Sequence, residues 1–113
     1  MRRKRRPMRL EISKANVETS PSIDKAIAHK VEKVEERLKR YHPDAADLEI
    51  HLEFNDKRKF HECTLNLKAF KDTLHAKKSA PELRMAIDRT FDALIKELDH
   101  YRVKVNKSLQ QTE

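Results

Sequence analysis

The sequence contains no glycine and no tryptophan, and only one cysteine among its 113 residues. The absence of glycine argues against phosphate-binding loops and dinucleotide-binding folds, which need it for tight turns and close backbone approach to the ligand. The single cysteine, Cys63, cannot form an internal disulfide, which predicts a reducing compartment. No apolar run reaches the roughly 18 residues that a membrane-spanning helix needs. Together these absences predict a cytoplasmic protein.

Charge is abundant but unevenly placed along the chain. Charged residues make up 40% of the sequence and aromatic residues 5%, so we expect a well-solvated surface over an aliphatic core of single-domain size. The net charge is +7, and the five basic residues at positions 2–6 account for most of it. The rest of the chain is only mildly basic, so binding to a polyanion requires that its charges be sorted onto one face.

Residues 1–7 (MRRKRRP) form a block of like charges, which repel one another and favour a disordered extension. Alternative interpretations are a nucleic-acid-binding arm, an upstream extension of a chain whose natural start is Met8, and an artefact of cloning or gene-start assignment. We expect a basic extension over 1–7, a folded domain over 8–107 and a short tail over 108–113.

Hydrophobic periodicity predicts two helices and four strands. The alternating residues 9–14 (RLEISK) predict a strand. Ser20 as N-cap, Pro21 and the apolar stripe that follows predict a helix over roughly 20–41. A second helix is expected to open at Ser79, with Glu82 at capping-box spacing. The three strands expected between the helices lie at 47–55, 61–70 and 73–78, where polar and apolar residues alternate.

The predicted order is β-α-β-β-β-α, an α+β fold. Short polar breaks between the last three strands predict an antiparallel meander. We expect one antiparallel four-stranded sheet, with both helices side by side on its single apolar face. Cys63 is expected to point inward from its strand as a small core residue.

Basic side chains gather on one side of each predicted helix. At about 100° per residue, most of those on the second helix fall near 220–260° from Leu83, whereas its acids fall near 140–180°. Candidate RNA contacts on the first helix are Lys25, His29, Lys33, Arg37 and Arg40. Those on the second are Arg89, Lys96, His100, Arg102, Lys104 and Lys107. We expect the two bands to flank a groove between the helices, suited to a phosphate backbone whose counterions are released on binding.

Catalytic and metal-binding patterns are not found in the sequence. None of the six histidines pairs with a cysteine or carboxylate at a spacing typical of zinc ligands. No Ser-His-Asp or Cys-His arrangement has a supporting motif. We therefore expect no enzymatic activity, no catalytic residue, no metal and no cofactor, and we interpret the histidines as surface or RNA-contacting side chains.

Several segments match a known family in order. They are MRLEISKANVE, SIDKAIAHKVEKVEERLKRY, the alternating LEIHLEF and CTLNLKA, and above all LHAKKSAPELRMAIDRTFDALIKELDHYRVK, in which AID at 86–88 matches the family's second-helix pattern. From Met8 onward the chain resembles the short ribosome hibernation promoting factors, also called the ribosome-associated inhibitor A family. The sequence departs from the family pattern at Arg84, Glu97 and Asp99. Because the resemblance is to the short forms, we expect no C-terminal dimerisation domain of the kind that the long forms carry.

The resemblance implies the β-α-β-β-β-α fold and binding to the small ribosomal subunit and its ribosomal RNA. Family members occupy the channel used by messenger RNA and by the anticodon ends of tRNAs, and they inhibit translation in stressed or stationary cells. The chain is then expected to compete with messenger RNA and tRNA, to avoid membranes and to be monomeric when free. Whether ribosomes are paired or held as inactive singles stays open. The matching positions are Lys33, Arg37, Arg40, Arg89, Lys96, His100, Arg102, Lys104 and Lys107.

Two other interpretations fit parts of the sequence. A double-stranded-RNA-binding module also packs two helices on a three-stranded sheet and reads the shape of A-form RNA, and KKSA at 77–80 is similar to its phosphate-binding helix start. The extra leading strand and the absence of glycine count against it. A protein-interaction domain is the other alternative, in which the basic bands are only solvated surface with helix-stabilising pairs such as Asp92 and Lys96.

Overall fold

Six elements form the fold in the computed structural model, which describes residues 8–41, 46–69 and 72–111. Their bounds are β1 (Arg9–Ala15), α1 (Pro21–Tyr41), β2 (Ala46–Asn55), β3 (Phe60–Ala69), β4 (Asp72–Ala80) and α2 (Leu83–Gln111). This order confirms the predicted β-α-β-β-β-α fold. The extension expected over 1–7 lies outside the described residues. Of the tail expected over 108–113, residues 108–111 belong to α2, and residues 112–113 lie outside the described residues. No helix in the described ranges is long and apolar enough to cross a membrane.

The four strands form one sheet in the order β1-β2-β3-β4. The meander prediction is confirmed, because β2, β3 and β4 pair antiparallel. The prediction of an entirely antiparallel sheet is wrong, because β1 pairs with β2 in parallel. The physical reason is the connection between them: α1 carries the chain back along the sheet, so β2 starts at the same end as β1.

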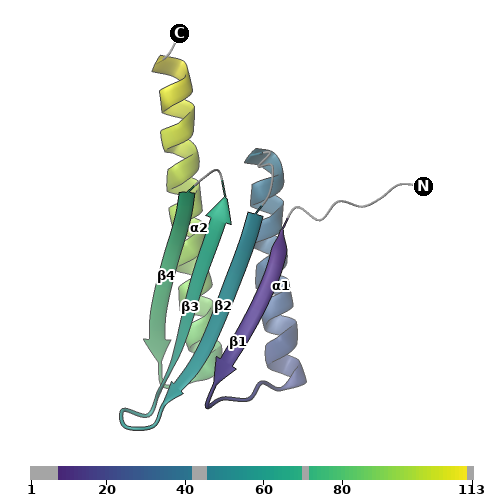
Figure 1. Ribbon diagram of the computed structural model, residues 1–113, viewed down its shortest axis with the longest axis vertical. Helices are drawn as coiled ribbons and strands as arrows, with labels where there is room; N and C mark the ends of the chain where they lie inside the picture. Colours follow the sequence, from purple (N-terminus) through teal and green to yellow (C-terminus); the bar gives the residue numbers. More distant parts are fainter. Residues whose placement is uncertain (1–7, 42–45, 70–71, 112–113) are drawn as a thin grey trace, which may run out of the picture.

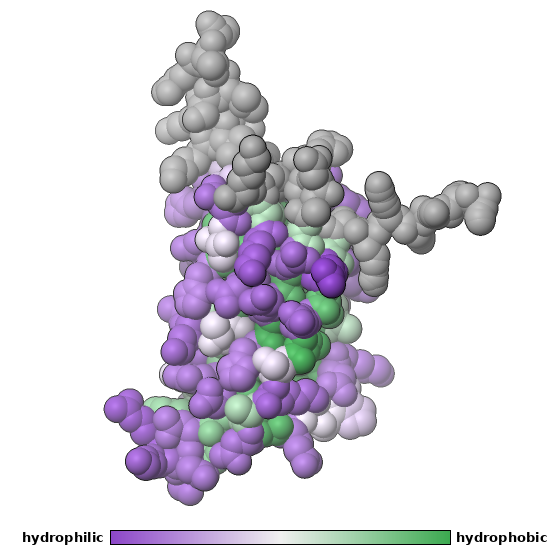
Figure 2. Space-filling view, in the orientation of Figure 1, coloured by the Kyte–Doolittle hydropathy of each residue, from purple (hydrophilic) through white to green (hydrophobic). Residues whose placement is uncertain are grey.

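Both helices lie on one face of the sheet, as predicted. Figure 1 shows α1 behind β1 and β2, and α2 behind β3 and β4, with α2 running on past the end of the sheet. The opposite face of the sheet, turned toward the viewer, is mostly hydrophilic, with a smaller hydrophobic area over β1 and β2 (Figure 2). The molecule is therefore a two-layer α/β slab with one helix-covered face and one open face.

The core lies between the sheet and the helices. Strand alternation sends every second side chain of β2 and β3 under the helices, and these side chains are buried. The helical stripes meet them with side chains such as Val34, Leu38, Phe91 and Leu98, each with no exposed surface. Burying a large aliphatic or aromatic side chain contributes about 1.5–3 kcal/mol, so this layer is the main source of stability.

The N-terminal ends of the two helices differ in how well the sequence predicts them. The Ile23 backbone N–H donates to the Ser20 hydroxyl over 3.2 Å, which confirms Ser20 as the N-cap of α1. The expected start of α2 at Ser79 is wrong. Ser79 pairs with Glu62 in the β3–β4 ladder, and α2 begins only at Leu83, after Pro81. Ser79 resembles a helix N-cap in sequence, but pairing with β3 keeps it in strand β4.

Cys63 is expected to make the stability of the protein decrease at alkaline pH. Burial raises the pKa of its thiol to about 11, although a hydrogen bond with Thr90 acts in the opposite direction. Since the folded pKa lies above the unfolded one, the contribution of the thiol is full below the unfolded pKa and is lost as pH rises toward the folded value. Urea unfolding at several pH values between about 8 and 11 measures this loss. In wild type we expect the thiol to lower the free energy of unfolding by about 2 kcal/mol over this range. The Cys63→Ala variant is the control, and an equal pH dependence in it contradicts the assignment.

Candidate functional site

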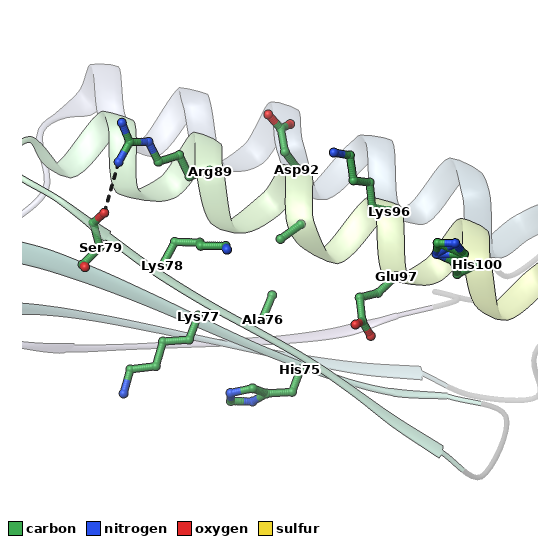
Figure 3. A pocket seen from close by; sticks show the side chains of 11 residues that line it. His75, Ala76, Lys77, Lys78, Ser79, Arg89, Asp92, Lys96, Glu97 and His100 are labelled. Carbon is green, nitrogen blue, oxygen red and sulfur yellow. Dashed lines mark hydrogen bonds between the residues drawn. The ribbon is translucent and has the colours of Figure 1, made fainter.

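An open groove of about 740 Å³ runs between the edge strand β4 and the helix α2. Side chains from both elements face it, and Figure 3 shows Lys78 reaching along it toward the helix. It is lined by His75, Ala76, Lys77, Lys78, Ser79, Arg89, Asp92, Ala93, Lys96, Glu97 and His100. We call this feature the β4–α2 groove.

Strand alternation decides how β4 contributes to the β4–α2 groove. Ala76 and Lys78 point toward α2, whereas His75 and Lys77 project from the other side of the strand (Figure 3). Lys78 therefore places its ammonium group between strand and helix. Lys77 lies on the open face, where its Nζ is 4.0 Å from an oxygen of Glu62.

Helical spacing decides how α2 contributes. Arg89, Lys96 and His100 are separated by seven and four residues, which places them on one side of the helix, and all three are exposed. The Arg89 guanidinium donates to the carbonyl oxygen of Ser79 over 3.3 Å and so ties the first turns of α2 to the end of β4. The three side chains line the β4–α2 groove together, in agreement with their predicted clustering on α2.

The β4–α2 groove carries more positive than negative charge. The side chains of Lys78, Arg89 and Lys96 outnumber its two carboxylates, those of Asp92 and Glu97, even without Lys77, which projects to the open face. Exposed lysine and arginine side chains suit the phosphates of a nucleic-acid backbone. No cluster of potential metal ligands occurs among the described residues. What the arrangement offers is therefore electrostatic binding of an extended polyanion along an exposed edge.

The predicted contacts on α1 do not line this groove. Lys25, His29 and Lys33 are exposed on the helix surface. Arg37 is half-buried, and its Nε lies 3.2 Å from an oxygen of Asp99 on α2. Such a partly exposed ion pair contributes only about 0.2–1 kcal/mol, but it occupies the guanidinium and orients it toward α2.

The groove expected between the two helices stays a prediction, and the described side chains at this boundary include acids as well as bases. Ion pairs cross the boundary between α1 and α2: Lys30 Nζ lies 3.5 Å from Asp88, and Arg37 pairs with Asp99. Asp88 and Asp99 of α2 thus face bases of α1, whereas Arg89, Lys96 and His100 line the β4–α2 groove together with the acids Asp92 and Glu97. The side chains of Arg40, Arg102, Lys104 and Lys107 lie outside the described part of the structure.

Sequence reasoning missed the contribution of β4 to the site. His75, Lys77 and Lys78 were not among the candidate contacts on the two helices, because the basic bands were predicted from helical periodicity. The available signal was the KK pair in an edge strand that leads directly into the basic helix. In any strand followed by a helix that packs back along it, one of two adjacent lysines must face that helix.

Comparison with known proteins extends these observations. A family model described as sigma 54 modulation protein / S30EA ribosomal protein matches residues 10–106. A ribosomal subunit interface protein from Coxiella burnetii superposes with a TM-score of 0.69 at 14% identity, over 84% of this chain and 98% of that one. The N-terminal domain of Thermus thermophilus Protein Y gives 0.64 at 18% identity, over 80% and 94%. No curated protein sequence matches. At these identities the structural likeness establishes a shared fold.

Proposed function

Because the chain belongs to the sigma 54 modulation protein / S30EA ribosomal protein family, we propose that it is a ribosome hibernation factor. In this proposal it binds the small ribosomal subunit in the channel for messenger RNA and tRNA and inhibits translation under stress or in stationary phase. It acts in the cytoplasm, without catalysis or a cofactor. The observation that carries the proposal is the family match across nearly the whole folded region, which includes the β4–α2 groove.

Inhibition in this proposal is steric and electrostatic. Lys78, Arg89 and Lys96 hold phosphates of ribosomal RNA along the β4–α2 groove, and each neutralised phosphate releases counterions. The slab then fills space that messenger RNA and tRNA need. Two of the acids of α2, Asp88 and Asp99, are paired with bases of α1, which reduces their repulsion of RNA.

The proposed RNA-contacting set combines the sequence-based candidates with the residues that β4 adds. Arg37 has the weakest support, because it already pairs with Asp99. The set is Lys25, His29, Lys33, Arg37, Arg40, His75, Lys77, Lys78, Arg89, Lys96, His100, Arg102, Lys104 and Lys107.

Co-sedimentation with purified ribosomal subunits tests the proposal. We expect the protein to sediment with small but not with large subunits. Messenger RNA and tRNA bound beforehand should reduce its binding. Association should weaken steeply with salt, by about tenfold or more between 0.05 and 0.2 M if three or more phosphates are contacted. Addition to a cell-free translation reaction should lower protein synthesis in proportion to the fraction of small subunits occupied.

Other outcomes of the same experiment favour the alternatives. Tighter binding to free duplex RNA than to small subunits identifies a double-stranded-RNA-binding module. Binding to neither identifies a protein-interaction domain whose basic side chains only solvate the surface. Either outcome contradicts the proposed function.

A further inference from the structure

The free edge of β1 is a surface that the proposed function does not use. β1 is the first strand of the sheet and pairs only with β2, so one side of its backbone lacks a strand partner among the described residues. The register places Leu10 beside Leu48 and Ile12 beside Ile50. Leu48 and Ile50 are buried, but Leu10 and Ile12 remain 45% and 42% exposed.

Natural edge strands are usually protected against pairing with another chain by prolines, bulges, central lysines or very short length. β1 has seven residues (RLEISKA), no proline and no lysine before Lys14. It pairs with β2 in one unbroken register. By contrast, β4, at the other edge, carries Lys77 and Lys78 and is accompanied by α2. Of the two edges of the sheet, β1 is therefore the one open to strand addition.

We propose that two copies of this chain associate through antiparallel pairing of their β1 strands, centred on Leu10. This register puts Leu10 opposite Leu10 and Met8 opposite Ile12 on the face that carries the helices. On the open face it puts Arg9 of each chain opposite Glu11 of the other. Residues directly opposite in an antiparallel pair interact, and apolar and oppositely charged pairs are favourable.

Neighbouring registers that keep the apolar side chains on the same face are less favourable. A centre at Glu11 places the two Glu11 carboxylates directly opposite each other. A centre at Ile12 places Leu10 opposite Lys14. Like charges directly opposite are destabilising, and a lysine opposite Leu10 replaces an apolar pair. Among the described residues of β1, the side chains therefore favour the register centred on Leu10.

The surroundings of Glu11 within one chain favour the same partner. Its register neighbour on β2 is Glu49, a like charge, whereas Arg9 lies beside Asp47. Among the described residues Glu11 has no ion pair, while Glu49 is paired with Lys68 over 3.6 Å. The Arg9 side chain of a second copy therefore supplies a cation on the unoccupied side of Glu11.

The resulting pair continues the sheet to eight strands. A two-fold axis perpendicular to the sheet keeps both helix layers on the same face, and Figure 1 shows α1 behind β1 and β2, so the two α1 helices become neighbours in that layer. The two β4–α2 grooves lie at the far ends of the joined sheet and stay open. An interface of this size is small, so we expect weak, reversible association, in contrast to the sequence-based expectation of a free monomer.

Sedimentation equilibrium of the nucleic-acid-free full-length protein tests the pairing. The protein concentration is varied over about 10–500 µM. The buffer contains about 0.3 M salt, which screens the general repulsion between positively charged chains. We expect a concentration-dependent dimer in wild type and about tenfold weaker association in Arg9→Glu and in Glu11→Arg, because each change makes both charge pairs repulsive. An equimolar mixture of the two variants should recover the wild-type affinity, since acids then oppose bases at both pairs.

Three results overturn the proposal: wild type that stays monomeric throughout, single variants that associate as well as wild type, or a mixture that does not recover. The control is Lys77→Glu on the opposite edge of the sheet, which should leave the dimer affinity unchanged. If this variant weakens the dimer, β4 forms the contact instead of β1. Because RNA is absent from every sample, these results are independent of the ribosome-binding proposal.

Discussion

Replacing Lys78 and Lys96 together by glutamate is expected to weaken binding to the small ribosomal subunit by about 10- to 100-fold at 0.1 M salt. Both ammonium groups line the β4–α2 groove, one from the strand and one from the helix. The double variant turns two attractions for phosphate into two repulsions. Both side chains are exposed, so the folded structure should persist. Filter binding or co-sedimentation at several salt concentrations measures the affinity, and the salt dependence should become shallower by about two phosphate contacts.

The matched control changes the same amount of charge elsewhere. Lys39 on α1 and Lys57 in the β2–β3 turn are exposed and lie outside the β4–α2 groove. The Lys39→Glu, Lys57→Glu variant should lose at most a few-fold in affinity through net charge alone. If it binds as weakly as the groove variant, the groove has no special role and the attraction is a property of the whole surface.

The Phe91→Ala variant is expected to lower the free energy of unfolding by about 3–5 kcal/mol. Phe91 projects from α2 into the space between the helices and the sheet and has no exposed surface. Its removal forfeits apolar burial and leaves a cavity that a two-layer slab cannot fill without moving a helix. Because small domains are stable by only about 5–15 kcal/mol, much of the protein is expected to be unfolded or aggregated at 37 °C. Urea unfolding followed by circular dichroism gives the value.

Phe60→Ala provides the matched comparison for Phe91→Ala. Phe60 begins β3 and is 39% exposed, so the same chemical change should cost about 1 kcal/mol or less. Equal losses in the two variants contradict a core organised around the α2 stripe.

The order of elements could be predicted because most of them bury one face. Buried residues recur with a period of two in the strand that holds Leu48, Ile50 and Leu52, which indicates a strand. They recur with a period of 3.6 in the segment that holds Phe91 and Leu98, which indicates a helix. Hydrophobic periodicity does not indicate whether β1 is parallel or antiparallel to β2, because that direction depends on the path of the chain through α1. The start of α2 was misplaced since Ser79 and Glu82 satisfy a local capping rule that ladder pairing overrides.

The candidate site could be predicted in part for a similar reason. The side of a helix on which a residue lies follows from the rotation per residue alone, so Arg89 and Lys96 were correctly placed together. Which neighbour each face meets depends on tertiary packing. The sequence therefore did not reveal that Arg37 would be engaged by Asp99, or that Lys78 of β4 would complete the basic edge.

The parallel placement of β1 also has a consequence for the order of assembly. Ser13 and His51 are neighbours in the sheet although 38 residues separate them, whereas the β2–β3–β4 hairpins and α2 pair segments that follow closely in the chain. Long loops cost more entropy to close, so the hairpins form early and β1 docks last, after α1 is in place. The same strand should be the first to detach in native-state fluctuations, and its amides should exchange with deuterium before those of β3.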